Sequence, residues 1–211
     1  MNKKIVILVL QLGTGGAERM VCNLANILVQ NNDVKIISTY KLNDTPAFNL
    51  NNKIKLEYLL ENLKPNKQEL KSALKKFNIL LICKELFKRL RILWLRKSLM
   101  IKAIKELDCD IVISTRILHT NWLGKYANSN IIKIAQEHNH HNNNPKYIKK
   151  VIKSLKNIDY FMPVSKELCD FYSSRLDKTK VKYIPNFIEK MPLQKSSLRN
   201  KQLLSVGRLE K

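Results

Sequence analysis

The sequence predicts an α/β fold in which an open, doubly wound sheet of parallel strands carries helices on both faces. Two observations support this prediction. Residues 5–10 form an unbroken apolar run, and residues 34–39 are also rich in Ile and Val, as is typical of strands that are buried on both faces. Longer segments with apolar residues at helical spacing alternate with these runs. With 211 residues, 45% of them hydrophobic, the chain can bury a core and has room for one domain or one and a half.

The first half of the chain begins with an expected strand at 3–10, which ends in six consecutive apolar residues. Residues 11–16 contain three glycines and predict a loop, and the apolar residues of 17–30 recur at helical spacing. A second apolar strand is expected at 34–39, followed by a polar loop at 40–52 and a strand at 53–60. Residues 68–107 predict a long helical segment that can contain one break.

The second half of the chain predicts shorter elements in continued alternation. We expect helices at 118–126, 146–156 and 166–176, and strands at 110–114, 130–135, 159–164, 180–184 and 202–206. The polar segments 136–145 and 185–200 are expected to be irregular. In a sheet of this kind, ligands bind outside the carboxyl ends of the strands, so the residues that follow each strand are the candidates for a site.

The loop after the first strand contains Gly13, Gly15 and Gly16. Glycines let the backbone approach a ligand closely, and the N-terminus of the following helix suits a phosphate or a sugar hydroxyl. The segment is neither a P-loop nor a complete G-x-G-x-x-G motif. Its alternative interpretation is a tight strand–helix turn.

The segment 136–141 reads Gln-Glu-His-Asn-His-His and follows an expected strand. We interpret His138 as an acid/base or substrate-orienting group whose tautomer is held by the adjacent carboxylate of Glu137. No metal is expected, because neither a cysteine nor a second carboxylate cluster completes a site. His140 and His141 are expected in a solvated loop, and His119 is expected to pack at the start of a helix. The alternative interpretation is that the whole segment is a solvated polar loop.

The net charge of +22 indicates an anionic partner, although a composition rich in Asn and Ile is also typical of codon bias that inflates Lys. Residues 64–105 carry 13 basic and 2 acidic side chains, a net charge of +11. A helix there would place apolar residues and Trp94 on one face, with Lys84, Lys88 and Arg91 opposite. This pattern suits the surface of an anionic membrane. The alternative is a helix packed on the core with a solvated basic face. A nucleic-acid partner is not expected, because no RNP-type motif or zinc finger is present.

The chain contains no apolar run of the length of a membrane span and no secretory signal pattern. Its four cysteines are far apart and are expected to be buried, reduced thiols. These features predict a cytoplasmic protein, with peripheral binding to the inner face of the cell membrane through the basic segment.

Five short motifs in order resemble the N-terminal half of a retaining glycosyltransferase of family 4, with the two-domain GT-B architecture. Residues 12–19 are similar to the "GGAER" opening of such enzymes, 136–139 to their strand–His segment and 163–166 to their "VS" turn. Residues 184–188 resemble the motif before the interdomain linker, although Phe187 replaces the usual Gly. Residues 205–209 resemble the "VGRL" that opens the second domain.

The resemblance implies a Rossmann-like, acceptor-binding domain over residues 1–200, with a linker from about 185, and the first strand of a donor domain at 201–211. It implies transfer of a sugar from a nucleotide-sugar to a lipid-linked or surface-glycan acceptor, without a metal or other cofactor. Gly13, Gly15 and Gly16 would border the diphosphate or the acceptor, together with Glu137 and Asn186. His138 would orient the reacting sugar, and Arg208 would contact phosphate.

The resemblance also implies that the remainder of the donor domain, in cis or in trans, is needed for activity, so we expect little transferase activity from these 211 residues alone. The alternative function is a non-catalytic binding domain that relies on a partner chain for the donor site.

Overall fold

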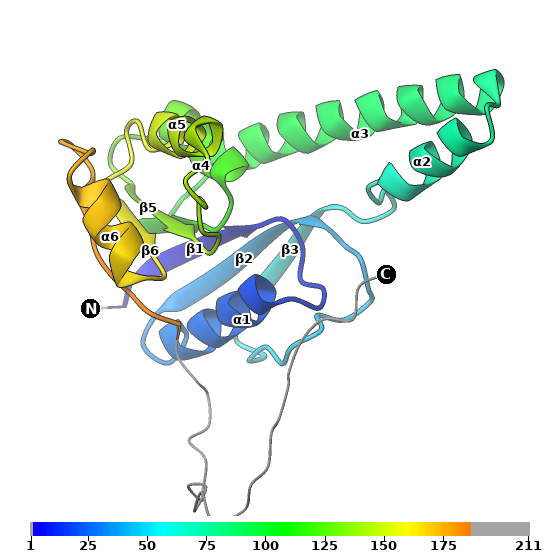
Figure 1. Ribbon diagram of the computed structural model, residues 1–211. Coiled ribbons are helices and arrows are strands. Elements are labelled where there is room, and N and C mark those ends of the chain that lie inside the picture. The colour runs from blue at the N-terminus through cyan, green and yellow to red at the C-terminus, as the bar shows by residue number, and fades with distance from the viewer. Residues whose placement is uncertain (1, 187–211) are drawn as a thin grey trace, which may run out of the picture.

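The computed structural model describes residues 2–186, which form one parallel sheet with helices packed on both of its faces (Figure 1). The expected strand at 202–206, Arg208 and the domain boundary near residue 200 lie outside the described residues. The predicted alternation of strands and helices is confirmed over the described part of the chain.

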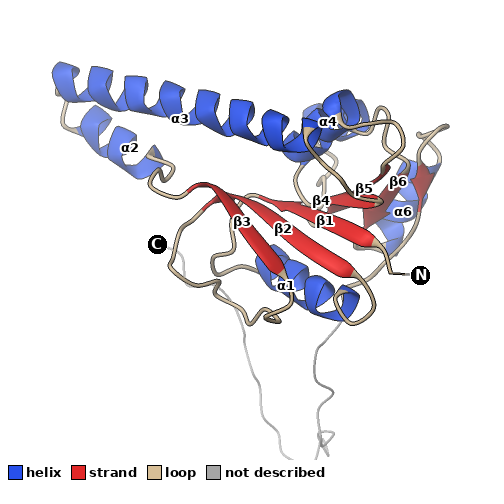
Figure 2. Ribbon diagram, turned by 180° about the vertical axis from the view of Figure 1, so that it is seen from behind, coloured by secondary structure: helices blue, strands red, loops and turns tan. Residues whose placement is uncertain are grey.

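The sheet has seven strands in the order β3-β2-β1-β4-β5-β6-β7, and every neighbouring pair is parallel (Figure 2). The strands are β1 (Lys4–Val9), β2 (Asp33–Tyr40), β3 (Lys55–Leu60), β4 (Ile111–Ser114), β5 (Ile132–Glu137), β6 (Tyr160–Pro163) and β7 (Lys180–Val181). The order reverses at β1, because the chain moves from β1 to β2 and β3 on one side and returns to β4 on the other. This reversal marks the place where sheets of this class bind ligands.

The helices divide between the two faces of the sheet. They are α1 (Gly16–Leu28), α2 (Lys67–Lys75), α3 (Ile79–Lys105), α4 (Ile117–Tyr126), α5 (Pro145–Ser154) and α6 (Lys166–Ser173). Helix α1 packs on one face, where Val21 and Ala25 join Ile7 in one apolar cluster. The C-terminal part of α3 packs with α4, α5 and α6 in a second cluster, which includes Met100 and Leu155. The doubly wound α/β prediction is therefore confirmed, and the fold is Rossmann-like.

Short polar side chains set the boundaries of three helices. Asn78 accepts a hydrogen bond from the amide of Leu81 and starts α3, directly after Phe77 with its positive φ of 49°. Asn144, followed by a proline, caps α5, and Ser165 caps α6. Such caps satisfy amides that have no partner within the helix. The break expected within 68–107 is thus confirmed and lies between α2 and α3.

Two strands end two or more residues away from the predicted position. Strand β5 runs to Glu137 rather than ending at 135, because Gln136 and Glu137 continue the ladder opposite Met162 and Pro163 of β6. Strand β7 has only two residues instead of five, since its pairing stops opposite Phe161. The later end of β5 determines which way Glu137 and His138 face.

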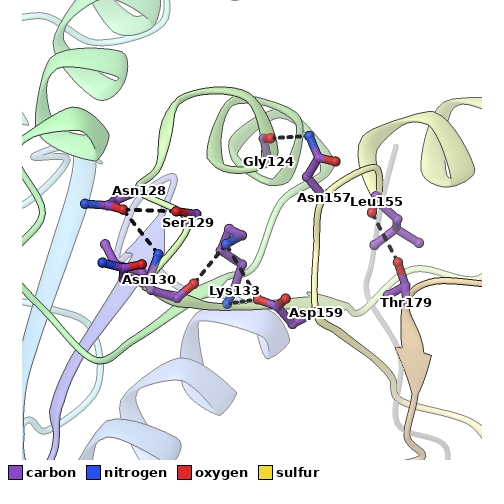
Figure 3. Close-up of polar contacts among 10 residues, drawn as sticks. Gly124, Asn128, Ser129, Asn130, Lys133, Leu155, Asn157, Asp159 and Thr179 are labelled. Atoms are coloured by element: carbon purple, nitrogen blue, oxygen red, sulfur yellow. Dashed lines mark hydrogen bonds and ion pairs between the residues drawn. The ribbon is translucent and has the colours of Figure 1, made fainter.

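The amino end of the sheet is closed by local polar contacts (Figure 3). Lys133 is buried, and its amide donates to Asp159 Oδ2 at 2.7 Å while its Nζ donates to the carbonyl of Ile131 at 2.9 Å. Asn157, at a positive φ of 63°, donates its side-chain amide to the carbonyl of Gly124 at 3.1 Å. These contacts hold the turns between α4, β5 and β6 and leave the carboxyl edge for ligands.

Helix α2 and the first part of α3 extend away from the sheet as a helical arm, residues 67–94 (Figures 1 and 2). Asn66 joins the two helices, because its side-chain amide donates to the carbonyl and to the carboxylate of Glu85 at 2.9 and 2.8 Å. Among the described residues, no helix is long and apolar enough to cross a membrane.

Candidate functional site

The candidate site lies at the carboxyl edge of the sheet, around the reversal of strand order at β1. The loop after β1 and the residues after β4 border this edge, and an ion pair bridges them. Arg116, the second residue after β4, contacts Glu18 of α1 with a distance of 2.9 Å between Nη2 and Oε1. Glu18 is buried while the Arg116 side chain is 33% exposed, and the pair holds the first turn of α1 against the β4 side of the crevice.

In the glycine-rich loop, the space beside Gly15 is occupied by the carboxylate of Glu18. A Cβ on Gly15 would collide with Oε2 of Glu18, whereas a Cβ on Gly16 would meet nothing within 4 Å and one on Gly13 only an ordinary contact with Leu42. The backbone of Gly15 is extended, with φ at 179°, so its requirement is for space. The close approach expected for a ligand is therefore made in this structure by Glu18.

Glu137 and His138 face opposite sides of the sheet, because consecutive residues of a strand point in opposite directions. Oε1 of Glu137 accepts hydrogen bonds from the amide and the side chain of Asn139 at 2.9 and 3.0 Å. Among the described residues, neither ring nitrogen of His138 has a partner. The expectation that Glu137 holds the tautomer of His138 is thus wrong. Strand β5 continues through Glu137, and this separates the two side chains.

His138 faces the side of the sheet that α1 covers and borders a small cavity of about 30 Å³, the His138 pocket. The cavity is lined by Met20, Leu24, Gln136, His138, Met162, Val164 and residues 184–186, so Asn186 and His138 border the same cavity. Burial lowers the pKa of His138, and the cation of Arg116 lowers it further, while Glu18 partly offsets both effects. The ring is thus favoured in its neutral form, which can both donate and accept a hydrogen bond.

Glu137 faces the other side of the sheet and borders a cavity of about 200 Å³, the arginine pocket. Its lining comes from α3, α4, α5 and the ends of β1, β4 and β5, and consists of Leu10, Arg96, Arg116, Ile117, Leu118, His119, Glu137, Asn139 and Tyr147. Burial raises the pKa of Glu137, although hydrogen bonds from Asn139 oppose the shift. Burial and the cation of Arg96 lower the pKa of His119 to about 3, so this ring is neutral at physiological pH.

The buried polar atoms without partners concentrate in these two pockets. Within residues 2–186 six such side-chain atoms occur, and five of them belong to Arg96, His119, His138 and Tyr147, which line the pockets. Buried polar groups are normally hydrogen-bonded, so unpartnered ones call for an explanation such as water or a ligand. Their concentration at the carboxyl edge identifies both pockets as candidate binding sites.

The other histidines divide differently from the prediction. His119 is fully buried and packs in α4 as expected, with its Nε2 3.1 Å from Oγ1 of Thr39. His140 is exposed and contacts Asn142. His141, expected in solvent, is instead buried against Phe171 and Tyr172 of α6, because the loop after β5 folds back over that helix.

The cysteines only partly follow the prediction. All four are free, but Cys22 alone is buried, and Cys83 is exposed on the arm. Within the described part of the chain, no group of three or more His, Cys, Asp or Glu side chains could hold a metal ion.

Sequence reasoning missed Arg96 and Tyr147 as site residues. Arg116 follows a strand at the carboxyl edge, so the rule for this sheet class selects it as a candidate, but the sequence assigned it no role. Arg96 and Tyr147 carry no comparable signal, because each lies within an ordinary amphipathic helix.

The comparisons with known proteins are sparse. No protein-family model and no curated protein matches the chain. Among solved structures, the fold is similar to an alpha-glucosyltransferase in complex with UDP-glucose and DNA containing an abasic site, with a TM-score of 0.47 and 13% identity. The match covers 88% of this chain and 43% of that one, so the chain spans less than half the length of that enzyme.

Proposed function

We propose that the chain is the acceptor-binding domain of a retaining, family 4 type glycosyltransferase, which moves a sugar from a nucleotide-sugar to a lipid-linked or surface-glycan acceptor. One observation carries the proposal. His138, the residue that the motif resemblance selects, is half-buried at the carboxyl edge of the sheet, and both of its ring nitrogens are buried without partners in a pocket shared with Asn186.

A neutral imidazole in this position suits sugar chemistry. One ring nitrogen can accept a hydrogen bond from a sugar hydroxyl while the other donates one, which fixes the sugar's orientation. During transfer, the bond from the sugar to the diphosphate breaks, a bond to the acceptor oxygen forms, and the proton of the acceptor hydroxyl passes to the departing diphosphate. Arg116 lowers the pKa of His138 and so favours the neutral imidazole that this role requires.

The proposal predicts that loss of the gene changes a cellular glycan. Lipid-linked and surface glycans would be extracted from cells with and without the gene and compared by mass spectrometry. In the deletion strain we expect the glycan to stop at the acceptor and to lack the sugar that this enzyme adds. The complete glycan should return when the gene is restored. Identical glycan profiles in both strains would contradict the proposal.

We also propose that the helical arm binds an anionic membrane surface, which would bring the domain to a lipid-linked acceptor. Exposed apolar side chains form a stripe along α3 that includes Phe87, 73% exposed, and Trp94, 66% exposed. The other exposed members of the stripe are Ile79, Leu80, Cys83, Leu86 and Leu90. No described residue covers this stripe, so the alternative of an apolar face packed on the core is wrong for these positions.

The packing of α3 explains why the stripe stays exposed. Glu85 and Ile92 are buried, so a different face of the helix contacts α2 and the sheet. At about 100° per residue, Lys84, Lys88 and Arg91 lie about a third of a turn from the apolar stripe. Interfacial helices combine an apolar face with flanking cations in this way, and each engaged Lys or Arg contributes up to about 1 kcal/mol on an anionic surface.

A further inference from the structure

We infer that the arginine pocket binds a phosphate ester, with Arg96 as the ligand for the phosphoryl oxygens. The inference rests on the proposed function and narrows its acceptor to a phosphorylated one, such as a glycosyl phosphate. A phosphate on a free sugar and a phosphate on a lipid present the same chemistry to the pocket.

Arg96 is the first reason. Its Nε is buried and has no hydrogen-bond partner among the described residues, and none of the ion pairs within residues 2–186 includes this side chain. Its polar neighbours include the hydroxyl of Tyr40 and the neutral ring of His119, and the same pocket is lined by a second cation, Arg116, and by the carboxyl group of Glu137. Arg96 as a whole is partly exposed, but an Nε buried without a partner is unfavourable, and the planar set of guanidinium donors matches two oxygens of a phosphate.

The two carboxyl groups nearby are already engaged elsewhere. Glu18 pairs with Arg116 at 2.9 Å, and Glu137 accepts both hydrogen bonds from Asn139. Neither approaches Arg96 within the 4.0 Å of an ion pair. The positive charge of Arg96 is therefore free to bind an anion that enters the pocket.

The remaining lining suits a hydroxyl-bearing group next to the phosphate. Glu137 and Asn139 supply acceptors and donors, and the hydroxyl of Tyr147 has no geometrically satisfactory partner. The volume of about 200 Å³ allows a small sugar rather than an extended glycan. Leu10, Ile117 and Leu118 provide the apolar part of the wall.

The position of Arg96 also connects the pocket to the arm. Trp94 and Arg96 are two residues apart on α3, which places them on opposite sides of the helix. Trp94 is exposed while Arg96 lines the pocket. The side of α3 that would face the membrane and the side that carries Arg96 are therefore separated by one helix diameter, about 10 Å. A phosphorylated acceptor held at the membrane would have to span that distance to contact Arg96.

The test is a binding titration of the 211-residue chain with three soluble probes. α-D-Glucose 1-phosphate represents a free sugar phosphate, geranyl diphosphate represents a lipid phosphate, and methyl α-D-glucoside is the uncharged control. Binding is followed by calorimetry and by the NMR signal of the arginine Nε–H groups. We expect at least one phosphate probe to bind and to shift the Arg96 Nε–H signal, and the uncharged control to do neither.

Two variants of neighbouring cations sharpen the test. Arg96→Gln removes the proposed ligand, and Lys97→Gln removes an exposed charge one residue away on the same helix. We expect Arg96→Gln to weaken phosphate binding at least tenfold and Lys97→Gln to weaken it less than twofold. Equal losses in both variants would overturn the inference, as would failure of both phosphate probes to shift the Arg96 signal in the unaltered chain. That NMR measurement remains decisive even if Arg96→Gln does not fold.

The outcome is separable from the proposed function. If cellular glycans did not depend on the gene, the glycosyltransferase proposal would be contradicted. Phosphate binding at Arg96 would still be a valid result in that case. Conversely, a changed glycan together with no phosphate binding would support the transferase function and contradict the inference of a phosphorylated acceptor. Binding of geranyl diphosphate alone would identify a lipid phosphate as the ligand.

Discussion

His138 and His119 show how burial sets the chemistry of individual side chains at the carboxyl edge. Both lie near Arg116, and burial lowers the pKa of both. They differ in what they meet. His119 contacts Thr39 within the fold, while both ring nitrogens of His138 lack a partner in the described residues. His119 therefore stabilises the architecture only when neutral, and His138 is available to a substrate.

Replacement of His138 by Ala should lower the kcat of sugar transfer by about 10²–10⁴, the range for loss of an acid/base or positioning group. The measurement is product formation by the complete enzyme. His140→Ala is the matched control, because His140 is exposed and borders neither pocket, and it should leave kcat unchanged. Full activity in His138→Ala would show that His138 takes no part in the transfer. His141→Ala is unsuitable as a control, since that ring is buried against α6.

His119 should make the fold sensitive to acid. Its pKa is about 3 in the folded protein, below the ordinary value of 6.5 that applies to the unfolded chain. Between these values the unfolded chain binds a proton that the folded protein does not, so stability falls as the pH falls below 6.5. From pH 7.5 to pH 5.5 this group should cost about 1 kcal/mol of unfolding free energy.

Urea denaturation of the unaltered chain and of His119→Gln at the two pH values checks this expectation. The substitution should remove about 1 kcal/mol of the pH-dependent loss, whatever its effect on stability at pH 7.5. If both proteins lost the same free energy between the two pH values, the assigned role of His119 would be wrong.

Helix α4 depends on a glycine that sequence periodicity does not select. A Cβ on Gly124 would collide with the backbone carbonyl oxygen of Lys156, and the following residue, Asn157, is hydrogen-bonded back to Gly124. Because the obstacle is backbone, it cannot move away as a flexible side chain would. This close approach fixes α4 against the turn that leads into β6.

Gly124→Ala should therefore destabilise the protein by about 1–3 kcal/mol, as overpacking does in a closed site. Gly16→Ala is the control, since its added Cβ meets nothing within 4 Å at the exposed start of α1. That variant should change stability by less than about 0.5 kcal/mol. Unfolding is followed through Trp122, which is only 6% exposed and lies in α4. Equal stability of the two variants would contradict the proposed packing constraint.

The arm should bind vesicles of anionic lipid more strongly than neutral vesicles, and the binding should weaken as salt shortens the Debye length from about 10 Å at 0.1 M to about 3 Å at 1 M. Because Trp94 is exposed in the apolar stripe, its fluorescence should shift to the blue when it enters the interface. Replacement of Lys84, Lys88 and Arg91 by Glu should weaken binding at least tenfold in co-sedimentation.

A second triple variant separates the arm from the overall charge. Replacement of Lys149, Lys150 and Lys153 by Glu removes the same charge from exposed positions on α5. This control should weaken binding less than threefold. Equal losses in the two triple variants would mean that net charge alone attracts the vesicles, and strong binding to neutral vesicles would remove the electrostatic contribution.

At the scale of the whole molecule, the sheet organises three surfaces around one edge. The His138 pocket opens on the face that α1 covers, and the arginine pocket lies on the face of α3, α4 and α5. Helix α3 links the second pocket to the arm, since it lines that pocket with Arg96 and then extends beyond the sheet (Figure 1). The proposed functions therefore share one geometric origin, the reversal of strand order at β1.

The sequence by itself determined the type and order of the secondary structure elements. Buried strands and amphipathic helices leave local signals, so the apolar run 5–10, the helical spacing in 17–30 and the break in the long helix were predicted from neighbouring residues alone. The same local reasoning placed Gly15, Glu137 and His138 at the carboxyl edge, because the ends of parallel strands meet there.

Only the tertiary structure decided what those residues contact. The register of β5 against β6 extends the strand by two residues and so sends Glu137 and His138 to opposite faces. The return of the chain from β3 to β4 brings Arg96 beside Arg116 and Tyr147, although these residues lie far apart in the sequence. Whether the apolar stripe of α3 is buried also depended on the packing of α2 at Glu85. Each of these outcomes depends on contacts between residues that are far apart in the sequence, and patterns of neighbouring residues do not determine such contacts.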